Sequence, residues 1–169
     1  GSGDAIWVAD TWHSRVFRIS NINGELSPGG PPFVDIVLGQ ANIFGTSANQ
    51  GLSHPRADTL ATPYNVAVGP DGNLYISDNG GEVGSNHRIL EFAASLFPRT
   101  VADTLYAIPA SRVYGTGGSF TIFGYQSSDP TCSPFALALH PQGALVAPMN
   151  GYSGQRFPLA YLDPQHFST

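Results

Sequence analysis

Lysine is absent from this chain of 169 residues, and all seven basic side chains are arginine. The formal net charge is −5 at pH 7, and charged residues make up 11% of the chain, against about a quarter in an ordinary soluble domain. A general nucleic-acid binder needs a basic stripe to neutralise phosphates, and a protein held electrostatically at a membrane needs a basic cluster. The composition therefore argues against both classes of protein.

Cysteine is almost absent, since Cys132 is the only one. No internal disulfide can form, and a zinc site built from several cysteines is excluded. No run of 18 apolar residues occurs, so we expect no insertion into a membrane. The chain shows no signal peptide and does not begin with Met. Residues 4–9 already have the pattern of a strand, so we expect the chain to start inside a fold.

Glycine, proline and aromatic residues are abundant by contrast. The chain has 20 Gly, 14 Pro, 10 Phe and 7 Tyr, and 41% of its residues are hydrophobic. Glycine and proline mark turns, and aromatic and β-branched residues favour strands. The composition predicts an all-β fold.

The sequence repeats itself about every 70 residues. Residues 4–10, Asp-Ala-Ile-Trp-Val-Ala-Asp, align with residues 72–78, Gly-Asn-Leu-Tyr-Ile-Ser-Asp, and each block is followed by Arg and an apolar strand. Residues 35–40 align with residues 111–116 in the same way. A third, decayed copy begins at residues 134–143, which align with residues 63–72.

The complete middle copy predicts four antiparallel strands, at residues 64–68, 73–77, 87–92 and 111–115. The first two are joined by the tight turn Gly-Pro-Asp-Gly at residues 69–72. Four antiparallel strands per repeat, stacked radially, form a β-propeller blade. We therefore predict one propeller segment over residues 1–169, with a partial blade at 1–40, a complete blade at 63–115 and a partial blade at 134–165.

Residues 63–78, followed by residues 86–92, resemble a near-consensus NHL repeat. The first copy keeps Val-Ala-Asp-Thr at residues 8–11, and Val-Leu-Gly-Gln at residues 37–40 resembles the form found in large secreted bacterial NHL-repeat proteins. The resemblance is strongest over residues 4–92. It implies a six-bladed ring, of which this chain supplies about half, and a place outside the cell or at the cell surface.

A half ring leaves open sheet edges, and such edges pair with other chains. We expect them to be covered by a partner chain, by self-association as a homo-oligomer, or by further blades of a longer parent protein.

Propeller topology places the loops between the second and third strands of each repeat on one face, together with the connections between repeats. In this chain these segments are long and rich in Asn, Ser, Gly and aromatic residues. Long loops on a rigid scaffold usually carry function, and this composition suits a protein, peptide or glycan ligand. The candidate ligand-binding residues are Trp12, His13, Phe44, Asn86, His87, Phe123, Tyr125 and Tyr152. The alternative is that several of the aromatic residues pack down their own loops.

Asp10 and Asp78 occupy one repeat position, and Arg15, Arg88 and Arg156 occupy another. One hypothesis makes the carboxylates a ring that holds a cation. The other makes all five residues structural, with each Asp capping a loop or pairing with Arg, and each Arg bridging neighbouring repeats. We favour the structural hypothesis because a residue repeated in every copy usually serves the repeat itself.

Few residues in the sequence have the pattern of a catalytic site. Propeller zinc lyases of the peptidylglycine amidating type resemble this fold, and they use a histidine metal site. Here His13, His54, His87 and His140 lack metal-ligand spacing, and no nucleophile elbow, phosphate loop or calcium loop occurs. We expect no cofactor and a non-catalytic binding or scaffold module. The alternatives are a structural subunit that assembles through open blade edges and a metal-dependent lyase or hydrolase.

Overall fold

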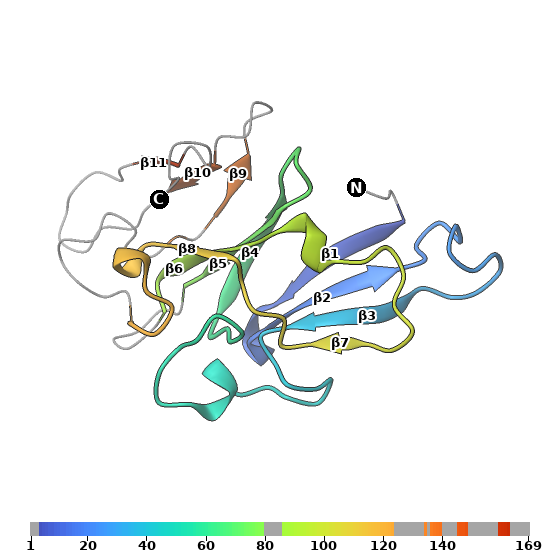
Figure 1. Ribbon diagram of the computed structural model, residues 1–169, viewed down its shortest axis with the longest axis horizontal. Helices are drawn as coiled ribbons and strands as arrows, with labels where there is room; N and C mark the ends of the chain where they lie inside the picture. The colour runs from blue at the N-terminus through green and yellow to red at the C-terminus, as the bar shows by residue number, and fades with distance from the viewer. Residues whose placement is uncertain are drawn as a thin grey trace.

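A computed structural model describes residues 4–79, 86–123, 134, 136–139, 145–148 and 159–162. Over these residues the chain is all-β, with strands, short 3-10 turns and no α-helix (Figure 1). No described segment forms a helix with the length and apolar character to cross a membrane.

The strands form three sheets that follow one another along the chain (Figure 1). The first sheet has the order β1 (Ala5–Asp10), β2 (Arg15–Ser20), β3 (Phe33–Leu38) and β7 (Leu105–Tyr106). The second sheet has the order β4 (Pro63–Val68), β5 (Leu74–Asp78), β6 (Arg88–Phe92) and β8 (Arg112–Tyr114). The third sheet has the order β11 (Leu159–Leu162), β10 (Leu145–Pro148) and β9 (Ala138–Leu139). The 3-10 turns are η1 (Thr11–His13), η2 (Ala48–Gly51), η3 (Ala94–Leu96) and η4 (Thr116–Gly118).

The second sheet agrees with the strands predicted for the middle repeat. Each observed strand lies within two residues of its predicted bounds, and all three pairings are antiparallel. The predicted turn at residues 69–72 is closed by hydrogen bonds from the Gly69 amide to the Asn73 carbonyl and from the Gly72 amide to the Gly69 carbonyl. Gly72 adopts a φ of +84°, which glycine tolerates because it has no Cβ.

The first sheet contains a strand that the repeat did not predict. The long connection between β6 and β8, for which the repeat predicted no strand, crosses to the first sheet and places β7 parallel to β3. The Ala107 amide donates to the Val37 carbonyl, and the Thr104 hydroxyl donates to the Val34 carbonyl. The first sheet therefore gains its fourth strand on the β3 side. Among the described residues, nothing pairs with β1 on its other side.

The second sheet packs between the other two. Its side chains Leu74, Ile76, Leu90, Phe92 and Val113 share one buried core with Val16, Ile36 and Leu38 of the first sheet. On the opposite side, its side chains Tyr75, Ile89 and Tyr114 form a second core with Leu137 and Leu139. This arrangement follows from strand alternation, because successive side chains of a strand point to opposite faces.

Gly39 ends β3 where the chain turns toward the second sheet. It adopts a φ of +88°, and a Cβ at this position would lie 2.7 Å from a methyl carbon of Leu60. Leu60 is fully buried in the core between the two sheets. Glycine at this position thus lets the connection between the sheets pack closely against the end of β3.

Candidate functional site

The repeated Asp and Arg of the second sheet form a buried ion pair. Asp78 ends β5, Arg88 begins β6, and the Arg88 Nε lies 3.1 Å from the Asp78 Oδ2. Both side chains are fully buried. The other oxygen of Asp78 accepts hydrogen bonds from the Ala61 and Thr62 amides, so the carboxylate caps the chain that enters β4. Hydrogen bonds and an opposite charge compensate the cost of burying this carboxylate.

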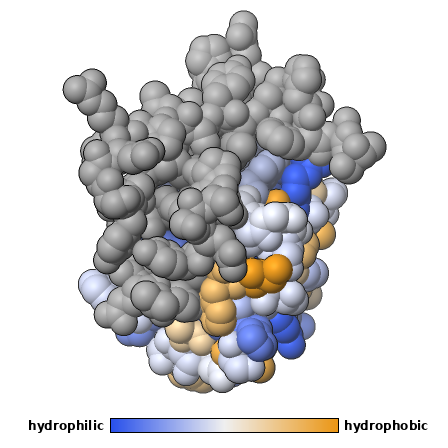
Figure 2. Space-filling view, turned by 90° about the vertical axis from the view of Figure 1, so that its left-hand side faces the viewer, coloured by the Kyte–Doolittle hydropathy of each residue, from blue (hydrophilic) through white to orange (hydrophobic). Residues whose placement is uncertain are grey.

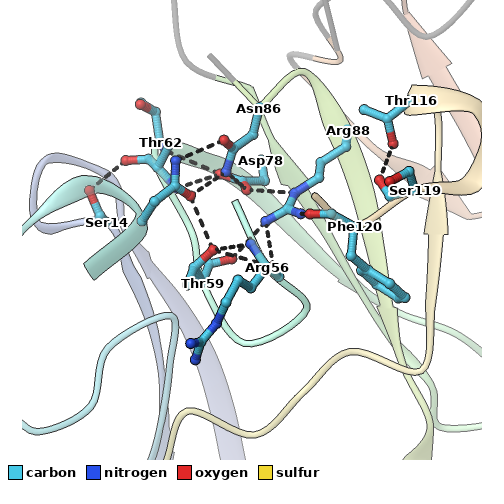
Figure 3. Close-up of polar contacts among 12 residues, drawn as sticks. Ser14, Arg56, Thr59, Thr62, Asp78, Asn86, Arg88, Thr116, Ser119 and Phe120 are labelled. Atoms are coloured by element: carbon cyan, nitrogen blue, oxygen red, sulfur yellow. Dashed lines mark hydrogen bonds and ion pairs between the residues drawn. The ribbon is translucent and has the colours of Figure 1, made fainter. Parts of the chain in front are cut away.

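Arg88 joins three segments through its remaining donors (Figure 3). Its Nη1 donates to the Phe120 carbonyl at 2.8 Å, and its Nη2 donates to the carbonyls of Arg56 at 3.0 Å and Thr59 at 2.9 Å. The first of these carbonyls follows β8, and the other two belong to the connection that comes from the first sheet. The Arg88 side chain thus ties β6 to the connection between the first two sheets and to the segment after β8.

The first sheet repeats this arrangement in a more open setting. The Arg15 Nε donates to Asp10 Oδ2 at 2.8 Å, and the His13 ring nitrogen Nδ1 lies 2.8 Å from Asp10 Oδ1. Burial alone would raise the pKa of Asp10, but the hydrogen bonds from Arg15 and His13 outweigh it and lower the pKa. The Arg15 guanidinium also lies 4.6 Å from the centre of the Phe17 ring.

These carboxylates do not form a cation site among the described residues. Each Asp is occupied by its own Arg and by neighbouring donors. No group of three or more His, Cys, Asp or Glu side chains lies together in the part of the chain that the structure describes. The observed contacts of Asp10, Asp78, Arg15 and Arg88 are those of structural residues.

Asn86 and His87, predicted to contact a ligand, lie inside the protein. The Asn86 amide exchanges hydrogen bonds with the Asn49 amide and donates to Asp78 Oδ2 at 2.6 Å. The His87 Nδ1 lies 2.8 Å from the Asn79 side-chain oxygen. Both side chains are buried, so they are unsuited to an exposed ligand surface. The sequence did not reveal this burial because the partner Asn49 comes from the distant connection between the first two sheets.

Trp12 and Phe44 are the most exposed large hydrophobic side chains of the described residues. Each is 87% exposed. Trp12 lies in η1, between β1 and β2, and Phe44 lies in the connection between β3 and β4. The alternative that these aromatic residues pack down their own loops is therefore wrong for both of them.

The backbone segments that carry Trp12 and Phe44 are held together. Arg15 donates through Nη1 to the carbonyls of Ile43 and Gly45, which flank Phe44. The amides of Phe44 and Gly45 donate to the Asn42 side-chain oxygen, which closes a tight turn. The two aromatic side chains therefore project from adjoining and well-anchored segments. We call this pair, with His13 beside it, the aromatic loop surface.

Phe123 lies in the segment that follows β8 and η4. Its ring packs against the His54 ring with 6.0 Å between the ring centres. A shallow hollow of about 490 Å³ lies beside His54, lined by Leu52, Ser53, Pro55, Arg56 and Thr121. Figure 2 shows apolar side chains in a compact patch among polar ones on the described part of one side of the molecule. The predicted candidates Tyr125, Tyr152 and Arg156 lie outside the described residues.

A larger hollow, which the sequence did not predict, lies between the start of β1 and the end of β4. It has a volume of about 640 Å³ and opens between Ala5 and Trp7 of β1, Val68 of β4 and the turn that follows β4. Trp7 packs on Phe97 with 4.8 Å between the ring centres. The hollow arises only because the connection after β6 folds back over the first sheet.

Comparison with known proteins adds no assignment. No protein-family model matches the chain, and no curated protein matches it at a significant level.

Proposed function

We propose that the three sheets are successive blades of an NHL-type β-propeller and that the chain is a non-catalytic binding module. Its ligand, a protein, peptide or glycan, docks on the aromatic loop surface. In both the first and the second sheet, an Asp–Arg pair joins the end of one strand to the start of the next, and this recurrence supports the propeller. The face-to-face packing of consecutive sheets supports it as well. The resemblance to secreted bacterial NHL-repeat proteins supports a place outside the cell or at its surface.

The exposure of Trp12 and Phe44 carries the proposal. Aromatic side chains each bury about 150–250 Å² in a full contact, worth on the order of 4 kcal/mol at about 25 cal/mol per Å². Neither ring obtains this stabilisation from the described residues of its own chain. Exposed aromatic residues of this kind are the usual anchors of binding surfaces.

The anchoring of both segments favours binding over simple exposure. The Asn42 turn, the Arg15 contacts and the hydrogen bonds from the Gln40 amide to the Ser14 and Ser47 carbonyls hold the backbone in place before any ligand arrives. A preorganised surface loses less conformational entropy when it binds. The polar side chains nearby, including His13, offer hydrogen bonds around the aromatic pair.

The proposal is tested with a displayed peptide library and an array of defined oligosaccharides. We expect binders whose affinity falls at least tenfold in Trp12→Ala and in Phe44→Ala. A Trp7→Phe background isolates the fluorescence of Trp12, because the chain has only two Trp residues. Binding should shift the Trp12 emission to shorter wavelength as the ring leaves water.

Phe33→Ala is the matched control, because Phe33 is also an exposed Phe but lies at the start of β3, outside the aromatic loop surface. Its binding should equal that of the unchanged chain. Binders that keep their affinity in both Trp12→Ala and Phe44→Ala would show that this surface is not the ligand site.

A further inference from the structure

The connection between β6 and β8 contains a segment that is fixed at both ends and only partly covered in between. We call residues 97–109 the strap. Just before it, the Ala94 amide donates to the Asn73 side-chain oxygen at 2.9 Å. Just after it, the Ala110 amide donates to the Ala57 carbonyl at 2.9 Å. The structure describes every residue of the strap, and none of them is buried. The strap therefore spans two fixed points without a fully buried side chain of its own.

Few polar contacts attach the middle of the strap to the first sheet. Its strand β7 pairs with β3 over two residues, in a parallel ladder, which is slightly less stable per residue than an antiparallel one. Beside this ladder, the Ala107 amide donates to the Val37 carbonyl at 3.2 Å. The Thr104 hydroxyl donates to the Val34 carbonyl at 3.3 Å. These contacts are confined to one short stretch, so they can be lost together.

Apolar contact between the strap and the first sheet is also partial. Phe97 packs on Trp7 with 4.8 Å between the ring centres. Leu105 and Ile108 pack against the core between the sheets, yet both are only partly buried. Arg99 adds an exposed ion pair at 3.5 Å, of a kind that contributes little to stability. Segments with few buried contacts open at a lower free energy than the core.

The attached strap holds one residue in a strained conformation. Ala107 has a φ of +47°, in the left-handed region that a residue with a Cβ rarely adopts. The hydrogen bond to Val37 is made from this conformation. Release of β7 lets Ala107 return to an ordinary backbone conformation, and this relief favours detachment of the strap.

The strap covers two features of the first sheet. Strand β7 occupies the outer edge of β3, whose backbone groups could otherwise pair with another strand. Phe97 and Arg99 line the hollow of about 640 Å³, together with Trp7 and Arg18 of the first sheet. Movement of the strap therefore changes access to the β3 edge and to this hollow.

We propose that the strap is a gate. It detaches from the first sheet as one unit while β1–β3 and the second sheet stay folded, and it turns about its two fixed ends. The open form exposes the β3 edge and the hollow, and pairing of β7 with β3 restores the closed form. This device is separate from the aromatic loop surface and does not rest on the proposed function of that surface.

The test is native-state amide hydrogen exchange of the full chain, measured by NMR at several low urea concentrations. We expect the Ala107 amide to exchange at least tenfold faster than the amides of residues 88–92. Its exchange should also depend less on urea, because opening of the strap exposes less surface than global unfolding. An Ala107 amide with the rate and urea dependence of residues 88–92 would overturn the gate.

Two conservative variants separate opening of the strap from global unfolding. Ile89→Val weakens the second core, away from the strap, and should speed exchange of residues 88–92 about fivefold while leaving Ala107 unchanged. Thr104→Val removes the hydrogen bond to Val34 and should speed exchange of Ala107 about fivefold. The matched control, Thr121→Val, changes an exposed Thr outside the strap and should leave Ala107 unchanged. Equal acceleration of Ala107 and residues 88–92 in Ile89→Val would contradict independent opening.

A third variant holds the gate open. Ala107→Pro removes the amide donor and forbids the positive φ, whereas Ala107→Gly keeps the donor and tolerates that φ. In a Trp12→Phe background, we expect Ala107→Pro to shift the Trp7 emission to longer wavelength as Phe97 leaves, with cooperative urea unfolding retained. Ala107→Gly should keep the emission of the closed form. Loss of cooperative unfolding in Ala107→Pro alone, or an unshifted Trp7 emission in it, would overturn the proposal.

Discussion

The Asp–Arg pair of the first sheet is partly open to solvent, whereas the equivalent pair of the second sheet is completely buried. The Asp10 and Arg15 side chains are 24% and 14% exposed, and those of Asp78 and Arg88 are both 0% exposed. The two pairs share their residue types, their strand positions and a salt-bridge geometry. Among the described residues they differ because the second sheet packs against a neighbour on each side, and the comparison teaches that similar repeats need not contribute equally to stability.

The largest difference is expected from removing the arginines. Arg88→Ala leaves the Asp78 carboxylate buried without its charge partner and removes donors to three carbonyls, so we expect a loss of about 3–5 kcal/mol in the free energy of unfolding. Arg15→Ala leaves the Asp10 carboxylate within reach of water, so we expect a loss of only about 1 kcal/mol in the free energy of unfolding. Urea denaturation monitored by tryptophan fluorescence measures both.

Arg99→Ala serves as the control for this pair of variants, because Arg99 is mostly exposed and makes only a 3.5 Å contact with Glu25. Its unfolding midpoint should not change. Equal losses of unfolding free energy in Arg88→Ala and Arg15→Ala would contradict the expected difference between the two ion pairs.

The apolar positions give the next largest contrast. Leu74→Ala opens a cavity in the core between the sheets and should cost about 2–5 kcal/mol. Ile6→Ala, at the equivalent repeat position, removes a half-exposed side chain and should cost less than about 1 kcal/mol. Thermal unfolding followed by circular dichroism tests this pair. A loss at Ile6 as large as that at Leu74 would mean that β1 is covered in solution.

Alkaline pH should affect the second sheet more than the first, because the second sheet has Tyr75 at the repeat position where the first sheet has Trp7. Burial, followed by the charges of Glu91 and Asp71, raises the pKa of Tyr75 to about 12. An unfolded tyrosine ionises near pH 10, so the folded state loses stability as the pH rises from about 10 to about 12, by on the order of 2 kcal/mol.

Tyr75→Phe should remove part of this alkaline loss, because Phe does not ionise. The buried Tyr114 also has a raised pKa and continues to contribute. Unfolding midpoints measured between pH 9 and pH 12 provide the readout. An unchanged alkaline dependence in Tyr75→Phe would show that Tyr75 ionises as freely in the folded state as in the unfolded chain.

Acid pH should give the smallest effect, and it should come from the first sheet. The lowered pKa of Asp10 means that its stabilising contribution is present at neutral pH and is lost as the pH falls below about 4 and the carboxylate is protonated. The side chain is partly exposed, so we expect less than about 1 kcal/mol. Asp10→Asn should reduce this acid dependence, and a profile identical to that of the unchanged chain would contradict the prediction.

The repeat predicted the strands and the ion pairs well because these are local features. Alternating apolar residues and a Gly-Pro-Asp-Gly turn specify an antiparallel pair such as β4 and β5 with few contacts from elsewhere. The recurrence of Asp10 and Asp78 at fixed strand ends led us to expect that each caps its loop or pairs with Arg, and in the structure Asp10 pairs with Arg15 and Asp78 pairs with Arg88.

The candidate site was predicted less completely. Trp12 and Phe44 are exposed, as a binding surface requires, whereas Asn86 and His87 are buried. Nothing near Asn86 in the sequence indicates its partner Asn49, which approaches across the connection between two sheets. Strand β7 was missed for a similar reason, since its two residues become a strand only by pairing with β3.

The order of residues by itself determined the strand pattern, the turns and the repeated Asp–Arg pairs, because each depends on backbone preference or on groups that adjacent strands bring together. Tertiary structure alone decided which copy of each repeated residue is buried and where β7 pairs. Burial depends on the neighbouring sheet, and similar local sequences acquire different surroundings when, among the described residues, one sheet has two neighbours and the other has one.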